Sequence, residues 1–303
     1  MLTLTGKKSN ARQRRKNLDA FLFCLPAILL GIVFLIVPII MSFVYSFTDF
    51  YMLAPQKTEF VGFQNYIDLF SDTIFWQAVK NTLYYVAVTV PVQCILALML
   101  ALMVHKKRKL VGVYRLMYFA PVITSATVVT ILFKLFYSET DGIFNLILEI
   151  MSLPRQGFLN DPKQAMLCLI LMSVWQGVGY QMIIIVAGLQ EINPTLYEAA
   201  SIDGAGRWRQ FWSITVPSLA PVLIFIAVTT FTGACKMFTQ AYIMTSGGPL
   251  NSTKTIVYYI YECGIVDRQV GYGSAISVVF TVVFIIASAI VGLILKKRRD
   301  KEA

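Results

Sequence analysis

The sequence has little charge, a single histidine and no paired cysteines. Only 14% of its 303 residues are charged and 57% are hydrophobic, whereas a soluble domain carries about a quarter charged residues. His105 is the only histidine, and the five cysteines are scattered with no CxxC pair. These absences argue against a histidine-based metal or catalytic site, a disulfide framework and a zinc site. The composition is typical of a chain that is surrounded by lipid.

Two further absences concern the energy source and nucleic acid. The sequence contains no GxxxxGK[ST] string, and the nearest string, at residues 5–9, lacks the first glycine and the Ser/Thr position. We therefore expect that the chain binds no ATP or other cofactor, holds no metal and is not itself an enzyme. The net charge of +10 does not indicate nucleic-acid binding, because the basic residues lie at the ends of apolar stretches and form no patch with interleaved aromatics.

The chain does contain long apolar stretches. Each is long enough to cross a membrane as a helix, which takes about 20 mostly apolar residues. The six stretches are 21–48, 80–104, 112–137, 164–189, 217–241 and 271–295. We expect an all-α membrane protein in which residues 1–303 form a single transmembrane domain with six transmembrane helices.

The basic residues predict the orientation of these helices. With six spans, the two ends of the chain and the loops 105–115 and 190–216 share one side, which carries most of the 26 Lys and Arg residues and a minority of the 16 acidic residues. Basic residues collect on the cytoplasmic side of spanning helices, so we expect both termini to be cytoplasmic. The basic residues on this side are Lys7, Lys8, Arg12, Arg14, Arg15, Lys16, Lys106, Lys107, Arg108, Lys109, Arg115, Arg207, Arg209, Lys296, Lys297, Arg298, Arg299 and Lys301.

The long loop on the predicted cytoplasmic side has the signals of two short helices. Asn193 is a good N-cap and Pro194 suits the first helical position, which predicts a helix over 194–202. Gly204 follows, and glycine readily takes the left-handed conformation that ends a helix. A second short helix over 207–214 should lead back to the fifth span. We therefore expect a compact helix–turn–helix at the membrane surface.

The first of these helices has the features of a docking surface. Ala199 and Ala200 are small and permit the close approach of another protein. Glu198 places a carboxylate beside them, which an arginine of a partner can bind.

The spacing within this loop resembles the EAA loop of ATP-binding-cassette (ABC) importer permeases. That pattern is EAA, three residues, glycine, nine residues, isoleucine, any residue, leucine and proline. Here Glu198-Ala199-Ala200 is followed at the same spacing by Gly204, Ile214 and Pro217, and only Val216 departs, where the pattern has leucine. The longer string Glu-Ala-Ala-Ser-Ile-Asp-Gly-Ala resembles the sugar-importing, maltose-transporter-type branch. Further strings that resemble this branch are Tyr45-Ser46-Phe47-Thr48, Gly62-Phe63-Gln64-Asn65-Tyr66, Asn81-Thr82, Thr245-Ser246-Gly247-Gly248-Pro249 and Gly271-Tyr272-Gly273-Ser274-Ala275.

The resemblance covers nearly the whole chain and implies a fold and partners. It implies the type I ABC importer permease fold in a multi-pass protein of a bacterial or archaeal plasma membrane. The implied partners are a second homologous permease subunit, two cassette ATPase subunits or a homodimer of them, which hold ATP and magnesium, and an extracytoplasmic solute-binding protein. Glu198 would pair with a basic residue of the ATPase, and Asp203 and Gly204 would set the turn. The residues implied in ATPase coupling are Glu198, Ala199, Ala200, Asp203, Gly204, Ile214 and Pro217.

Polar residues inside the spans are candidates for the solute path, since they should face the bundle interior or a wet cavity. Gln176 and Tyr180 are four residues apart on one face of the fourth span, and Gln181 follows. Thr127 and Ser277 are candidate hydroxyls in the third and sixth spans, although small hydroxyl residues also join membrane helices to one another.

Lys236 lies near the outer end of the fifth span. It either extends its ammonium group to the membrane interface or belongs to an outer gate.

These features predict a permease subunit that translocates a sugar or sugar-like solute by alternating access driven by partner ATPases. The alternative is an ion-coupled secondary transporter or a channel. The central thirds of spans two to six contain no Asp or Glu, which proton-coupled transporters commonly use. A membrane-embedded enzyme would need paired carboxylates or a histidine set, and the sequence shows neither. A disaccharide, an oligosaccharide or glycerol phosphate would all fit the resemblance.

Overall fold

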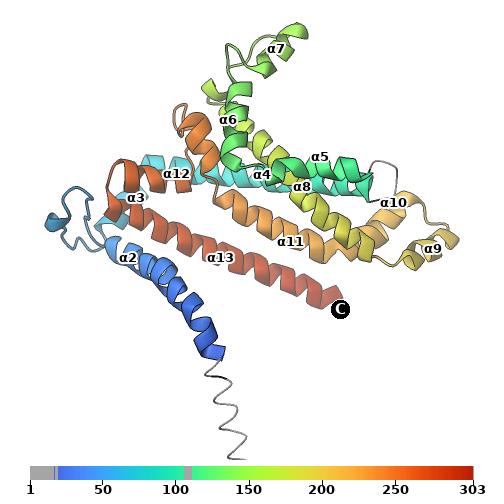
Figure 1. Cartoon of the computed structure of the whole chain (residues 1–303), viewed down its shortest axis with the longest axis horizontal. Coiled ribbons are helices and arrows are strands. Elements are labelled where there is room, and N and C mark those ends of the chain that lie inside the picture. The colour runs from blue at the N-terminus through green and yellow to red at the C-terminus, as the bar shows by residue number, and fades with distance from the viewer. Residues whose placement is uncertain (1–16, 18–19, 106–110, 303) are drawn as a thin grey trace, which may run out of the picture. The chain divides into compact units, whose positions relative to one another are not determined.

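The computed structural model describes residues 17, 20–105 and 111–302, and its regular secondary structure there is helical apart from two isolated β-bridges (Figure 1). The chain divides into two compact units, residues 1–69 with 263–279 and residues 70–262 with 280–303. The basic residues at 7–16 and at 106–109, on which much of the predicted orientation depends, lie outside the described residues.

Five helices are long and apolar enough to cross a membrane. They are Ala20–Tyr45, which ends in α2 (Val37–Tyr45), α4 (Thr73–Val104), α8 (Ala165–Glu191), Arg207–Cys235, which includes α11 (Val216–Cys235), and the first part, Val270–Ala289, of α13 (Val270–Glu302). A sixth span is formed if α5 (Val111–Ile123) and α6 (Ala126–Phe136) are counted together. The expectation of six transmembrane helices therefore fits five continuous helices and one bent pair.

The bent pair differs from the single straight span expected over 112–137. Its two helices meet at 97°. Pro121 lies in the last turn of α5, where its ring removes a backbone donor. Ser125 is extended, with φ −53° and ψ 131°, and α6 starts after it. The chain is therefore broken between the two helices and not merely kinked.

Shorter segments complete the fold. The short α-helices are α3 (Gln64–Ser71), α7 (Ile143–Ile150), α9 (Pro194–Ile202), α10 (Arg207–Gln210) and α12 (Ile256–Tyr261). Segments wound as π-helix are Ile32–Ile36, Phe211–Thr215, Ala241–Thr245 and Glu262–Val266, and 3-10 turns occupy Pro55–Lys57 and Phe158–Asn160.

Within the first unit, three short strings that resemble permeases in the sequence come together. Asn65 donates from its Nδ2 to the carbonyl oxygens of Ser46 (2.9 Å) and Thr48 (2.8 Å). The hydroxyl groups of Ser46 and Tyr66 are 2.7 Å apart. At Gly271, a Cβ would stand 2.1 Å from the carbonyl oxygen of Thr48, so only glycine permits this approach. These three strings therefore contact one another and stabilise the same part of the first unit.

Within the second unit, α8 is the central helix and packs against α4, α5 and α11 (Figure 1). Its side chains Leu169, Met172, Met182 and Ile185 are completely buried. Two clusters of buried apolar residues surround it, one around Met172 and one around Met182. The polar cavity described below lies beside this helix.

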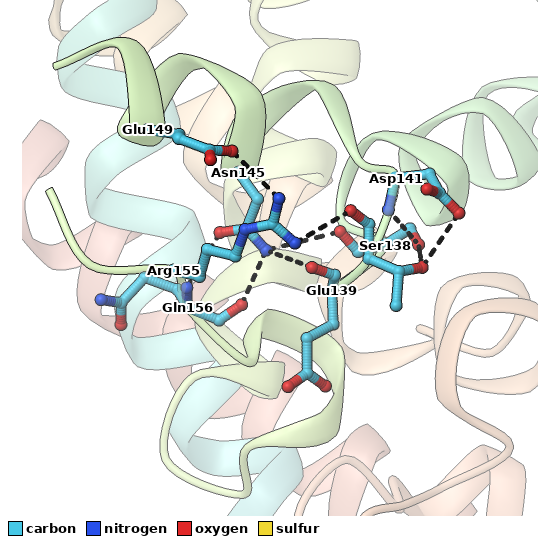
Figure 2. Close-up of polar contacts among 8 residues, drawn as sticks. Ser138, Glu139, Asp141, Asn145, Glu149, Arg155 and Gln156 are labelled. Carbon is cyan, nitrogen blue, oxygen red and sulfur yellow. Dashed lines mark hydrogen bonds and ion pairs between the residues drawn. The ribbon is translucent and has the colours of Figure 1, made fainter. Parts of the chain in front are cut away.

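The segment that carries α7 is held by one buried amide (Figure 2). Asn145 is only 1% exposed, and its Nδ2 donates to the carbonyl oxygens of Glu139 (3.1 Å) and Gln156 (2.9 Å). Its Oδ1 accepts the backbone N–H of Gln156 at 2.9 Å. An exposed ion pair joins Arg155 to Glu149 at 3.0 Å. These contacts give the segment a defined shape.

Candidate solute cavity and coupling loop

A cavity of about 330 Å³ lies in the second unit beside α4, α8 and the end of α11. Its lining is rich in hydroxyl, amide and aromatic groups. The polar and aromatic residues that line it are Tyr85, Thr89, Gln93, Ser173, Tyr180, Gln181, Thr229, Thr230, Lys236, Phe238, Thr239 and Gln240. Such groups bind polar, hydroxyl-bearing molecules, because each of them donates or accepts a hydrogen bond or offers a ring face.

Gln181 is the best-defined polar residue of this cavity. Its side chain is 6% exposed, and its Nε2 donates to Thr230 Oγ1 at 3.0 Å. Thr230 in turn donates to the carbonyl oxygen of Ile226 at 2.6 Å. Gln181 Oε1 is buried and has no hydrogen-bond partner among the described residues. A buried acceptor without a partner is unfavourable, and Gln181 is among the residues that line the cavity.

Residues at the end of α11 and in the break that follows also line the cavity. A continuous fifth span was expected over 217–241, but α11 ends at Cys235 and helical structure resumes only at Thr239. The carbonyl oxygen of Met237, in the break, accepts a hydrogen bond of 2.9 Å from Thr255 Oγ1. Non-helical backbone inside a membrane protein is tolerated where it is buried in protein or lines a cavity, and the residues of this break line the cavity.

The structure brings some of the predicted path residues to this cavity and leaves others elsewhere. Tyr180 and Gln181 line it. Gln176 is not among the lining residues and places its Nε2 3.5 Å from the carbonyl oxygen of Thr124. Thr127 is exposed on α6, and Ser277, in the other unit, donates to the carbonyl oxygen of Gly273 at 2.9 Å.

Sequence reasoning missed the contribution of α4 to this cavity. Tyr85, Thr89 and Gln93 all line it, and their spacing of four residues puts them on one helix face. Gln93 fits because residue 177 on α8 is glycine, where a Cβ would stand 2.2 Å from Gln93 Nε2. The spacing of polar residues within a span was the signal that could have found this face.

The predicted coupling loop folds as two connected helices. In α9, the Asn193 side chain accepts the backbone N–H of Thr195 at 3.0 Å, which caps the helix. Gly204 has φ +75° after the end of α9, which is the left-handed region that favours glycine. The second helix was expected as a separate element over 207–214. In the structure it runs through α10 and the π-helical Phe211–Thr215 directly into α11.

Side-chain contacts hold α9 against the start of the long helix. The hydroxyl of Tyr197 lies 2.9 Å from Thr215 Oγ1. Gln210 Nε2 donates to Ser201 Oγ at 2.9 Å and to the carbonyl oxygen of Ala205 at 3.0 Å. Glu198 and Ala199 are exposed. The loop therefore presents these two residues to the outside from a braced helix.

The remaining predicted coupling residues lie around the turn and at the entry to the long helix. Asp203 and Gly204 are exposed at the turn, and Ala200 is half-buried. Ile214 is half-buried in the π-helical segment, and Pro217 is exposed in the first turn of α11.

Long apolar helices, a polar cavity among them and a braced loop at one end define a multi-pass membrane permease. Residues 75–300 match the family of binding-protein-dependent transport system inner membrane components. The chain belongs to this family and is a permease subunit of an ABC importer in the plasma membrane. Membership of this family argues against the alternative of an ion-coupled secondary transporter or a channel.

Several known proteins are similar to this chain. The probable ABC transporter permease protein YurN of Bacillus subtilis (strain 168) is 36% identical over 274 residues, which cover 89% of this chain and 92% of YurN. The lactose transport system permease protein LacF of Rhizobium radiobacter is 38% identical over 256 residues, covering 82% of this chain and 84% of LacF. A crystal structure of a bacterial alginate ABC transporter, in complex with alginate pentasaccharide-bound periplasmic protein, contains a chain with the same fold. Its TM-score is 0.81 at 24% identity, covering 92% of this chain and 94% of the other.

Proposed function

We propose that this permease subunit translocates a sugar or sugar-like solute through the cavity beside α8. The buried Oε1 of Gln181, which has no hydrogen-bond partner among the described residues, carries this proposal, because a donor would satisfy it and sugar hydroxyls are donors. Tyr180 and Tyr85 add aromatic rings to the same lining. The names of relatives support a carbohydrate, since one is a lactose permease and one structural neighbour belongs to an alginate transporter.

The energy for transport comes from partner subunits in this proposal. The sequence contains no GxxxxGK[ST] phosphate-binding loop, so ATP and magnesium are held by two cassette ATPases. A second permease subunit completes the pathway, and an extracytoplasmic binding protein delivers the solute. Solute access then alternates between the two sides of the membrane as the ATPases close and open.

The α9 loop is the coupling element in this proposal and lies on the cytoplasmic side with both ends of the chain. Glu198, Ala199 and Ala200 dock on an ATPase, and Asp203 and Gly204 set the direction of α9. Ile214 and Pro217 lie where the loop enters the long helix that ends at the cavity. This continuous helix supports the proposal, because a movement of the loop would be passed directly to the backbone beside the solute.

The proposed site is tested with two glutamine variants on the same helix. Gln181→Leu keeps the size of the side chain and removes its hydrogen bonds, and Gln176→Leu makes the same change outside the cavity. Cells that produce the whole importer are given a panel of labelled disaccharides and oligosaccharides. We expect Gln181→Leu to lower uptake about tenfold or more, the effect of losing one or two buried hydrogen bonds, with the ATPases still co-purifying. Wild-type uptake in Gln181→Leu would contradict the proposed site, and an equal loss in Gln176→Leu would move the path to the face of Gln176.

A further inference from the structure

The cavity carries a positive charge. Among the residues that line it in the described part of the chain, Lys236 is the only one with a formal charge. Its side chain is exposed, beside the break that follows α11. The other polar lining residues offer hydroxyl and amide groups, which do not neutralise an ammonium group. A single cation among neutral lining groups gives the cavity a positive potential.

The surroundings of Lys236 stabilise its charge without cancelling it. Its Nζ lies 5.9 Å from the centre of the Phe284 ring, a cation–π contact. It also follows the C-terminus of α11, where the helix dipole favours a cation. Two other lysines of the same unit have different surroundings. Lys254 forms an ion pair with Glu262, and Lys134 donates to the carbonyl oxygen of Ile243 at 2.8 Å.

The break in the helix holds Lys236 in place. Thr255, which is 1% exposed, binds the carbonyl oxygen of the adjacent Met237. This hydrogen bond holds the backbone next to Lys236, and Lys236 is among the residues that line the cavity. Gln181, whose Oε1 has no hydrogen-bond partner among the described residues, lines the same cavity. A ligand that satisfies both residues needs hydroxyl donors and a negative charge.

We propose that the cavity selects sugars that bear an anionic group, a carboxylate or a phosphate, and that Lys236 is the residue that binds this group. This inference rests on the proposed function and specifies its substrate class. It differs from the expectation that Lys236 only extends to the membrane interface, because a lysine that serves the interface would not affect which sugar is bound.

Matched probes test the charge without knowledge of the natural solute. Glucose, glucuronate and glucose 6-phosphate share a ring and differ at C6, and inorganic phosphate is the anion alone. Binding of each is measured with the whole importer complex in lipid nanodiscs, at low and at high salt. The variants are Lys236→Gln, Lys236→Met and Lys236→Arg, with Lys80→Gln as control. Lys80 is exposed on α4 and is not among the lining residues.

We expect the wild-type complex to bind at least one acidic probe about tenfold more tightly than glucose, the order of one charge-assisted hydrogen bond. The preference should disappear in Lys236→Gln and Lys236→Met, persist in Lys236→Arg and Lys80→Gln, and weaken at high salt. Comparison of glucuronate with glucose 6-phosphate shows whether the group is a carboxylate or a phosphate. Each variant is first checked for co-purification of the ATPases, so that a loss of assembly is not mistaken for a loss of selectivity.

Several outcomes would overturn the inference. These are no preference for either acidic probe, a preference that survives both neutral variants, or inorganic phosphate bound as tightly as glucose 6-phosphate. Equal binding of all three sugars that is lost in Gln181→Leu would overturn the charge selection and leave the cavity as the solute site. Binding of no sugar, together with full uptake by Gln181→Leu, would count against the proposed solute site as well.

Discussion

Glycines on α8 determine how closely its neighbours approach. A Cβ at Gly179 would stand 1.9 Å from the carbonyl oxygen of Tyr118 on α5, and one at Gly188 would stand 2.9 Å from Val222 Cγ2 on α11. The two obstacles differ. A backbone carbonyl moves only with its whole helix, whereas a valine methyl group can move by a small amount. Gly179 is therefore the stricter of the two positions.

Gly179→Ala should destabilise the packing of α5 on α8. Forcing extra volume into a packed contact costs about 1–3 kcal/mol, and Gly188→Ala should cost less. The measurement is the thermal unfolding temperature of the purified complex, followed by the loss of its monodisperse form. Equal temperatures for Gly179→Ala and the wild type would show that α5 can move away from α8 freely.

At the residue scale, the sequence identified some of the cavity and could not identify the rest. Gln181 and Tyr180 stood out as polar residues near the middle of a long apolar stretch. Gln93 is equally polar and equally central in its stretch, but the face of α4 that meets α8 depends on glycine at position 177 of another helix. Lys236 lies beside the cavity at the break that follows α11. The residues next to Lys236 in the sequence did not predict this break.

At the scale of elements, the contrast between α9 and α11 has a physical cause. The ends of α9 were predicted from Asn193, Pro194 and Gly204, whose chemistry acts within a few residues of the helix end. After the end of α11, the carbonyl oxygen of Met237 is bound by Thr255, which lies 18 residues further along the chain. Residues next to its ends determine the bounds of α9, whereas the break after α11 includes a carbonyl oxygen that is bound by the hydroxyl of Thr255.

Thr255→Val should loosen this break. The substitution preserves the shape of the side chain and removes the hydroxyl that binds the Met237 carbonyl and caps α12. Leaving a buried carbonyl unpaired costs about 1–3 kcal/mol, so the unfolding temperature should fall and solute uptake with it. Thr255→Ser retains the hydroxyl and should behave like the wild type. Wild-type stability and uptake in Thr255→Val would show that the break does not need this hydrogen bond, and a serine variant that fails as badly as the valine variant would show that the hydroxyl alone does not maintain it.

The coupling loop gives a second prediction at this scale. Gly204 has φ +75°, and no atom lies within 4 Å of a Cβ built there. A substitution therefore fails through backbone strain and not through collision. Gly204→Val should misdirect α9, whereas Gly204→Asn should be tolerated, because asparagine adopts the left-handed region more easily than valine does.

Glu198→Lys should have the same effect as Gly204→Val without disturbing α9, because the side chain is exposed. If Glu198 docks in a groove of the ATPase, the substitution leaves the basic residue there without its partner, which costs on the order of 3–5 kcal/mol. Both variants should insert into the membrane normally and lose the ATPases or lose transport. The measurement is co-purification of the ATPases together with uptake. Wild-type behaviour of both variants would show that this loop does not couple the subunits.

At the scale of the whole molecule, hydropathy predicted the helical class and the approximate positions of the spans. It did not predict the 97° bend between α5 and α6, because a proline such as Pro121 is compatible with a kinked helix as well as with two helices. Which of these forms is determined by packing against the rest of the unit, and the hydropathy of a single stretch contains no information about that packing.

The orientation in the membrane is a prediction that reporter fusions can test. A reporter that is active only outside the cytoplasm should be active when fused at Gly248 and inactive when fused at Lys107 or Ala303, because the basic residues collect beside the latter positions. The three fusions control one another, since an even number of spans must separate Lys107 from Ala303. Activity at Ala303 would contradict the arrangement of six spans with both ends cytoplasmic.

The last prediction concerns which subunits of the importer hydrolyse ATP. The purified chain alone should hydrolyse no ATP, because its sequence has no loop that could surround the phosphates with backbone N–H groups. Hydrolysis should appear when cassette ATPases are added, and it should depend on the α9 loop of this chain if the loop transmits their closure. Gly204→Val supplies the matched control, because it alters the loop and leaves the ATPases unchanged. The assay measures phosphate release by the chain, by the ATPases and by the assembled complex. Turnover by the chain alone that co-fractionates with it through further purification would place the ATP site on this chain and refute the proposed division.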